Sequence, residues 1–149
     1  MNKLLEVDFV EHSKNMMVRA RKRKSSHLKI NFYHLSILDL EKAGYDIVIT
    51  NFFFDQFSVS KANLILQHLK PKLKPNGLLI FSDFISTNHL WDSLINRTMY
   101  TFFQLTAQIR TNSFPPYNTL FSSHGFHAEQ YKKISRNILA TTYSLLPPN

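Results

Sequence analysis

The hydrophobic and polar positions of the chain predict strands and helices in turn. Residues 3–10 alternate as a strand, in which acidic side chains share one face with apolar ones. Ser13 is a suitable cap for a basic helix over residues 14–24. The residues expected on the inner side of that helix are Met16, Met17 and Ala20.

Three more apolar runs are typical of strands, and two of them are continuous enough to be buried on both faces. Ser58 or Ser60 can cap a helix whose periodic apolar positions lie on one face. Pro75–Gly77 predicts a turn before the last of these strands. The expected strands are 29–35, 46–54 and 78–84, and the expected helix is 61–73 with Ala62, Ile65, Leu66 and Leu69 inside. Strands that alternate with helices over short loops predict a mainly parallel α/β sheet.

The pattern changes after Phe84. Residues 90–109 have helical periodicity, and Pro115-Pro116 then breaks the chain. Residues 117–126 are expected to form a short helix that Gly125 closes. Residues 127–135 and 138–146 predict an antiparallel strand pair at the end of the sheet. The apolar stripe of the 90–109 helix comprises Trp91, Leu94, Ile95, Phe102, Leu105 and Ile109.

Length and composition fit one globular domain. The chain has 149 residues, of which 44% are hydrophobic, and this excludes a wholly disordered protein, collagen and a coiled coil. It has no cysteine, which excludes disulfides and fits a cytoplasmic protein. The acidic residue Glu6 lies too early for a secretory signal. The sequence contains no run of 18 apolar residues, so we expect no membrane-spanning helix.

The formal net charge of +8 raises the question of an anionic partner. Five of the six residues in 19–24 are basic, and they could contact RNA phosphates or anionic lipid. The alternative is the solvated outer face of a helix that covers a sheet. We favour that alternative and expect no nucleic-acid partner, because no stacking-aromatic motif accompanies the cluster.

Three segments together resemble the class I S-adenosylmethionine-dependent methyltransferases. Residues 11–21 (EHSKNMMVRAR) look like the family's acid-x-Ser-x-x-Met-hydrophobe-x-x-Ala-basic pattern. Residues 45–57 (YDIVITNFFFDQF) are similar to its central strand and the following loop, and 69–84 (LKPKLKPNGLLIFSDF) to its Leu-x-Pro-Gly-Gly-x-Leu segment and the strand that ends in an acid. The order and spacing of the three segments make the combination fairly specific.

The resemblance implies a Rossmann-like sheet with helices on both faces, in one partial methyltransferase-like domain over 1–149 with a helical insertion at about 85–117. It also implies S-adenosylmethionine as cofactor. A carboxylate at the carboxyl end of a strand can accept both ribose hydroxyls of a nucleoside, which suits Glu11. The other residues that the resemblance implies at the cofactor are Ser36, Ile37, Asn51 and Phe52, and those in a substrate pocket are Phe53, Asp83 and Trp91.

The sequence departs from the family at its beginning. The family's first strand and glycine-rich loop have no counterpart, and Gly44, Gly77 and Gly125 are too dispersed to replace the loop. Ser36 stands where the family has an acid that holds adenine. We therefore interpret the chain as an N-terminally truncated or degenerate domain. Three arrangements remain open: residues 3–10 pair with 46–54, a preceding segment supplies the missing strand, or the chain self-associates through an exposed sheet edge.

The function that this resemblance implies is methyl transfer to a small molecule, apolar or aromatic if the residues 90–109 cover it. No residue can be named as the catalytic base, and no convincing metal site is found. Two alternatives come from other classes. One is a fragment or pseudo-enzyme that keeps the fold without cofactor affinity, and the other is a basic module that binds RNA or a membrane surface.

Overall fold

The computed structural model describes residues 5–84, 116–135 and 138–145 of the chain. The chain divides into two compact units, Met1–Lys42 and Ala43–Asn149. Each unit has its own sheet, of two and four strands respectively, among the described residues.

The first unit consists of a parallel strand pair and one helix. Strand β1 (Leu5–Val10) pairs with β2 (Leu28–Tyr33) from Leu5↔Leu28 to Val10↔Tyr33. Helix α1 (Lys14–Arg21) joins them, and η1 (Ile37–Asp39), a 3₁₀ turn, follows β2. Ser13 caps α1 as predicted, because its side chain accepts a hydrogen bond from the Met16 N–H.

Helix α1 differs from the prediction in length and in one inner residue. It ends at Arg21 and not at residue 24, because the Lys22 N–H turns back to bond the carbonyls of Arg19 and Ala20. Met17 is buried at 4% exposure, but Met16 is 52% exposed, so the expectation that Met16 packs inside is wrong. Consecutive helical residues point about 100° apart, and only one of the two methionines can face the strands.

The face of β1 and β2 that bears Glu6, Asp8 and Asn31 carries a charged network, which explains why β1 alternates only partly between apolar and polar residues. The Asn31 amide donates to Glu6 Oε1 and Asp8 Oδ1, each at 2.8 Å. Lys42 Nζ lies 2.7 Å from Asp8 Oδ2. The hydrogen bond from Asn31 and the charges of Lys29 and Lys42 lower the pKa of Glu6.

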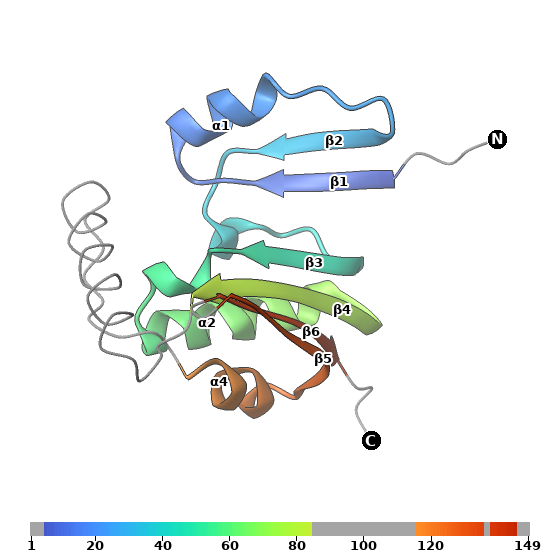
Figure 1. The fold of residues 1–149 in the computed structure, drawn as a ribbon. Coiled ribbons are helices and arrows are strands. Elements are labelled where there is room, and N and C mark those ends of the chain that lie inside the picture. Colours follow the sequence, from blue (N-terminus) through green and yellow to red (C-terminus); the bar gives the residue numbers. More distant parts are fainter. Residues whose placement is uncertain (1–4, 85–115, 136–137, 146–149) are drawn as a thin grey trace. The chain divides into compact units, whose positions relative to one another are not determined.

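The second unit is a mixed four-stranded sheet in the order β3-β4-β6-β5 (Figure 1). Strands β3 and β4 are parallel, whereas β4–β6 and β6–β5 are antiparallel, so this sheet is less parallel than predicted. The C-terminal strand pair is confirmed. The elements are β3 (Tyr45–Asn51), η2 (Phe54–Gln56), α2 (Val59–Leu69), η3 (Lys70–Lys72), β4 (Leu73–Phe84), α4 (Tyr117–Ser123), β5 (Phe126–Ser135) and β6 (Ile138–Leu145).

Helix α2 follows the predicted pattern, with Ser58 as its cap. All four residues expected inside, Ala62, Ile65, Leu66 and Leu69, are buried. The helix ends at Leu69 and not at residue 73, since Pro71 cannot donate a backbone hydrogen bond and a 3₁₀ turn follows. Gly125 has a φ of +80° and its N–H bonds the Ser122 carbonyl, so it closes α4 as predicted.

The predicted turn at Pro75–Gly77 lies inside β4. The partner of β3 moves from Leu73 to Leu78 while β3 advances only from Tyr45 to Ile47. Asn76 adopts a φ of +61°, which lets the extra residues bulge out. The segment therefore interrupts the register of a longer strand and does not precede it.

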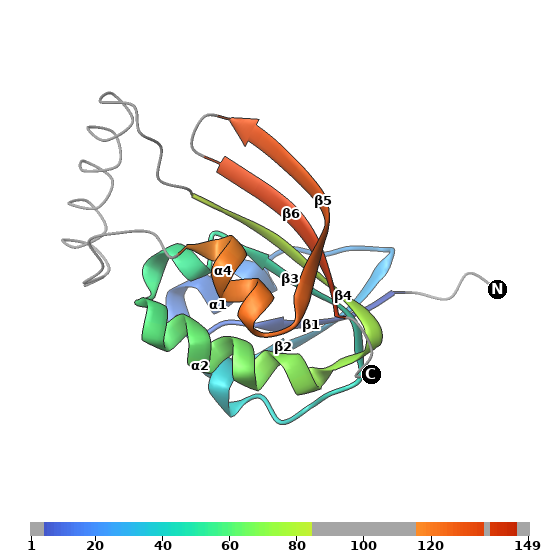
Figure 2. The ribbon, with the colours of Figure 1, turned by 90° about the horizontal axis from the view of Figure 1, so that it is seen from below.

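Helices α2 and α4 cover the same face of the four-stranded sheet (Figure 2). The core beneath α4 is aromatic. Phe121 is fully buried, stacks on Tyr143 at 4.5 Å between ring centroids, and meets Phe81 edge-on at 5.0 Å. Edge-to-face and offset-stacked rings are the arrangements that aromatic pairs prefer.

Strand β3 lies at an edge of this sheet among the described residues. Ile47 and Ile49 on it are 49% and 62% exposed. An apolar edge strand is a template for further pairing. Self-association through an exposed edge stays a prediction.

Candidate functional site

In the first unit, three of the predicted residues lie at one edge of the β1–β2 pair. Because the strands are parallel and Val10 pairs with Tyr33, the residues that follow them emerge at the same edge. Glu11 comes directly after β1, and its N–H donates to the Tyr33 carbonyl at 3.1 Å. Ser36 and Ile37 begin η1 after β2.

Glu11 is held in place by its own side chain as well. Its Oε1 accepts the Ser13 N–H at 2.7 Å, in the turn that leads into α1. An ionised carboxylate has about four acceptor positions, so this bond leaves capacity for two hydroxyl donors. The Ser36 hydroxyl accepts the Leu38 N–H at 3.3 Å, and Ile37 is half-buried beside it. This edge thus combines a fixed carboxylate with a small apolar surface, which suits a nucleoside.

In the second unit, a corresponding edge lies where β3 and β4 end. Asn51 pairs with Ser82, and the Ser82 hydroxyl donates to Asn51 Oδ1 at 2.6 Å. The Phe52 N–H donates to the Ser82 carbonyl at 2.7 Å, and the Phe52 ring is 48% exposed. Strand β3 ends at Asn51 and not at residue 54, because Phe52 takes a φ of +50° and η2 follows.

Asp83 lies behind this loop and is fully buried. Its Oδ2 accepts the backbone N–H groups of Phe53, Phe54 and Asp55 at 3.2, 2.7 and 3.1 Å. The carboxylate is therefore bonded to the loop backbone. A direct contact between Asp83 and a substrate stays a prediction. Trp91 and the expected helix 90–109 lie outside the described residues.

Two residues at this edge were not singled out from the sequence. Ser82, which orients the Asn51 side chain, carries no recognisable signal. Asp55 does carry one, as the only acid in the loop sequence after β3. It is half-buried, and burial raises its pKa above the usual value while two backbone N–H groups partly oppose the shift. Perturbed carboxyl groups of this kind are common at functional sites.

Asp55 should make the stability of the chain depend on pH. Its pKa is higher in the folded than in the unfolded chain, so ionisation disfavours the folded state and stability falls as pH rises through this pKa. We expect Asp55→Asn to be more stable than the wild type at about pH 7, and this advantage to disappear below about pH 3.8, the usual pKa. Urea unfolding at several pH values measures the difference. A gap that is constant with pH would contradict the assignment.

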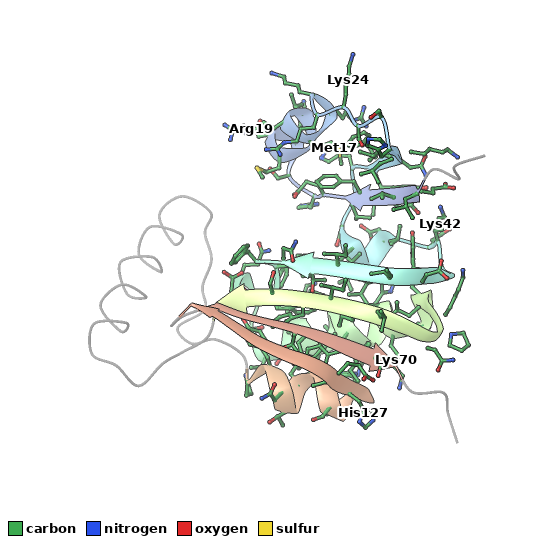
Figure 3. All side chains as sticks on the ribbon, turned by 45° about the vertical axis from the view of Figure 1, so that its right-hand side comes forward. Met17, Arg19, Lys24, Lys42, Lys70 and His127 are labelled. Atoms are coloured by element: carbon green, nitrogen blue, oxygen red, sulfur yellow. The ribbon has the colours of Figure 1, made fainter. Side chains whose placement is uncertain are left out.

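The basic cluster of residues 19–24 is solvent-exposed apart from Ala20. Arg19 and Lys24 point away from the strands, whereas Met17 lies on the strand side of α1 (Figure 3). The Arg21 guanidinium lies 5.7 Å from the centre of the Phe32 ring, which is a cation–π contact within the unit. These positions agree with a solvated outer helix face.

Within the part of the chain that the structure describes, no group of three or more His, Asp or Glu side chains is arranged to hold a metal ion. In the same residues, no helix has the length and hydropathy to span a membrane.

The chain resembles known methyltransferases in sequence and in fold. No protein-family profile matches it. It is 36% identical over 83 residues to a malonyl-[acyl-carrier protein] O-methyltransferase of Halalkalibacterium halodurans, and the match covers 52% of this chain. The chain spans about 30% of the length of that relative.

Solved structures match over nearly the whole chain. A SAM-dependent methyltransferase of Methanosarcina mazei superposes with a TM-score of 0.70 at 14% identity, covering 96% of this chain and 83% of that one. The structure of LepI in complex with SAM gives a TM-score of 0.64 at 12% identity, covering 97% of this chain and 43% of that one. At such identities these likenesses establish the fold and leave the chemistry to the residues of this chain.

Proposed function

We propose that this chain, which has the fold of the class I S-adenosylmethionine-dependent methyltransferases, binds S-adenosylmethionine and transfers its methyl group to a small molecule. The observation that carries the proposal is Glu11. Two hydrogen bonds, from its own backbone N–H to Tyr33 and from the Ser13 N–H to its carboxylate, fix it at the carboxyl end of β1. Ligands of open α/β sheets bind at this end of the strands.

The cofactor contacts that we propose are those that the resemblance to the methyltransferases implies. Glu11 accepts the ribose hydroxyls, and Ser36 and Ile37 contact the adenine. Asn51 and Phe52, at the end of β3, are assigned to the cofactor on the resemblance alone. Charge-assisted bonds to a carboxylate are stronger than neutral ones, so the contacts of Glu11 to the ribose are the strongest hydrogen bonds of the proposed nucleoside site.

The cofactor supplies a methyl group on a sulfonium, which is reactive toward a nucleophile placed in line with it. The protein therefore has to position the acceptor and exclude water, and a precise arrangement is worth several orders of magnitude in rate. Phe53, Asp83 and Trp91 are the residues that the resemblance assigns to the acceptor, and aromatic rings come from Phe53 and Trp91. Their rings favour an apolar or aromatic small molecule.

Calorimetry with S-adenosylmethionine tests the proposal directly. At about 100 µM protein, a dissociation constant in the micromolar range gives a complete binding curve. We expect saturable binding of one cofactor per chain. Absence of heat would contradict the proposal and support the alternative of a fragment or pseudo-enzyme without cofactor affinity.

A further inference from the structure

One buried oxygen atom organises the whole loop after β3. Asp83 Oδ2 receives three consecutive backbone N–H groups, those of Phe53, Phe54 and Asp55. Asp83 has no exposed surface, and a buried carboxylate is tolerated only where hydrogen bonds satisfy it. The loop therefore supplies the hydrogen-bond donors that the buried carboxylate needs, and the carboxylate in turn fixes the backbone conformation of the loop.

The conformation that is fixed in this way is a strained one. Phe52 has a φ of +50°, in the left-handed region that favours glycine and is unusual for a bulky residue. Such conformations persist only where the surroundings impose them. Two residues at the end of β4 accept hydrogen bonds from the backbone here. The Phe52 N–H donates to the Ser82 carbonyl, and the next N–H, that of Phe53, donates to the Asp83 carboxylate.

The loop is anchored in the core on the far side of the strained residue. Phe54 is fully buried and meets Phe121 edge-on at 5.5 Å. Phe53 packs edge-on against Phe54 at 5.1 Å and Phe57 at 5.0 Å. The Phe52 ring, by contrast, is nearly half exposed. Its strained backbone is thus not compensated by burial of its own side chain.

We propose that Asp83 is a positioning residue, which holds Phe52 in its left-handed conformation so that the Asn51 and Phe52 side chains are presented to the bound ligand. The inference rests on the proposed function for the identity of that ligand. In this assignment Asp83 acts on cofactor binding through the loop and not by touching the cofactor. Without the carboxylate, the loop relaxes to an unstrained path and Phe52 leaves its place.

The first test is a double-mutant cycle of Asp83→Asn and Phe52→Gly, in which the affinity for S-adenosylmethionine is measured for each variant. With Phe52 present, Asp83→Asn should weaken binding about tenfold or more, because the uncharged amide no longer overcomes the strain. In the Phe52→Gly background the same change should cost less than about threefold, because glycine adopts the conformation freely. Equal losses in both backgrounds would overturn the inference.

The second test is hydrogen exchange, which needs no ligand. Asp83→Asn should accelerate exchange of the amides of residues 53–55 while those of α2 retain their protection. Uniform acceleration throughout the second unit, or a chain that no longer folds, would assign Asp83 to the fold alone and overturn the inference. The matched control is Asp46→Asn, which removes an equal charge at the other end of β3, where Asp46 is exposed and paired with Lys74.

The two tests separate this inference from the proposed function. If the wild-type chain fails to bind S-adenosylmethionine, the proposed function is wrong, and the exchange experiment alone decides whether Asp83 controls the loop. If the wild type binds and Asp83→Asn binds equally well, the proposed function stands and the inference is wrong.

Discussion

Replacing Phe121 by alanine should destabilise the second unit by about 3–5 kcal/mol, the usual cost of truncating a buried phenylalanine. The whole stability of a typical domain is only about 5–15 kcal/mol. Phe121 is fully buried, and among the described residues its ring packs with those of Phe54, Phe81, Tyr117, Phe126 and Tyr143. The cavity would therefore open at the centre of the aromatic core, where rigid rings surround it.

Urea unfolding followed by circular dichroism measures this loss. The matched control is Leu64→Ala on α2, whose side chain is 53% exposed and whose truncation should change stability by less than about 0.5 kcal/mol. A Phe121→Ala chain as stable as the Leu64→Ala chain would show that the ring cluster does not form the core.

The second large effect is expected at Glu11. If its carboxylate accepts the ribose hydroxyls, Glu11→Ala should weaken S-adenosylmethionine binding by about 100-fold, since each hydrogen bond to a charged group contributes about 1.5–3 kcal/mol. Glu11→Gln keeps one acceptor oxygen and should give an intermediate loss. The affinity is measured by calorimetry at a temperature where every variant is folded.

The control for this experiment is Glu41→Ala, which removes the same charge from an exposed residue of the same unit. It should leave the cofactor affinity unchanged. If both variants lose cofactor affinity to a similar extent, the effect comes from the net charge of the unit and not from a contact with Glu11. If neither variant loses affinity, Glu11 does not bind the ribose.

The sequence predicted best where a local rule decided the structure. The caps at Ser13 and Ser58, the buried face of α2 and the glycine closure at Gly125 all depend on residues within one or two turns. Glu11 and Asn51, which the resemblance pointed to, lie at the carboxyl ends of β1 and β3, and their contact with a cofactor stays a prediction.

The predictions failed where distant residues decided the structure. Strand β3 stops at Asn51 because Asp83, about 30 residues later, binds the backbone beyond it. The apolar run from 46 to 54 contains no residue that predicts the end of the strand at Asn51. Likewise, Ser82 becomes important only through its register opposite Asn51, and register cannot be read from one strand alone.

The order of strands in the second unit has a consequence for synthesis. Strand β6 is made after β5, yet it lies between β4 and β5. Until β6 leaves the ribosome, β5 has no partner among the described strands and β4 has only β3. The four-stranded sheet therefore cannot be completed during translation of its earlier strands, and a premature stop before Ile138 would leave β5 with no described strand to pair with.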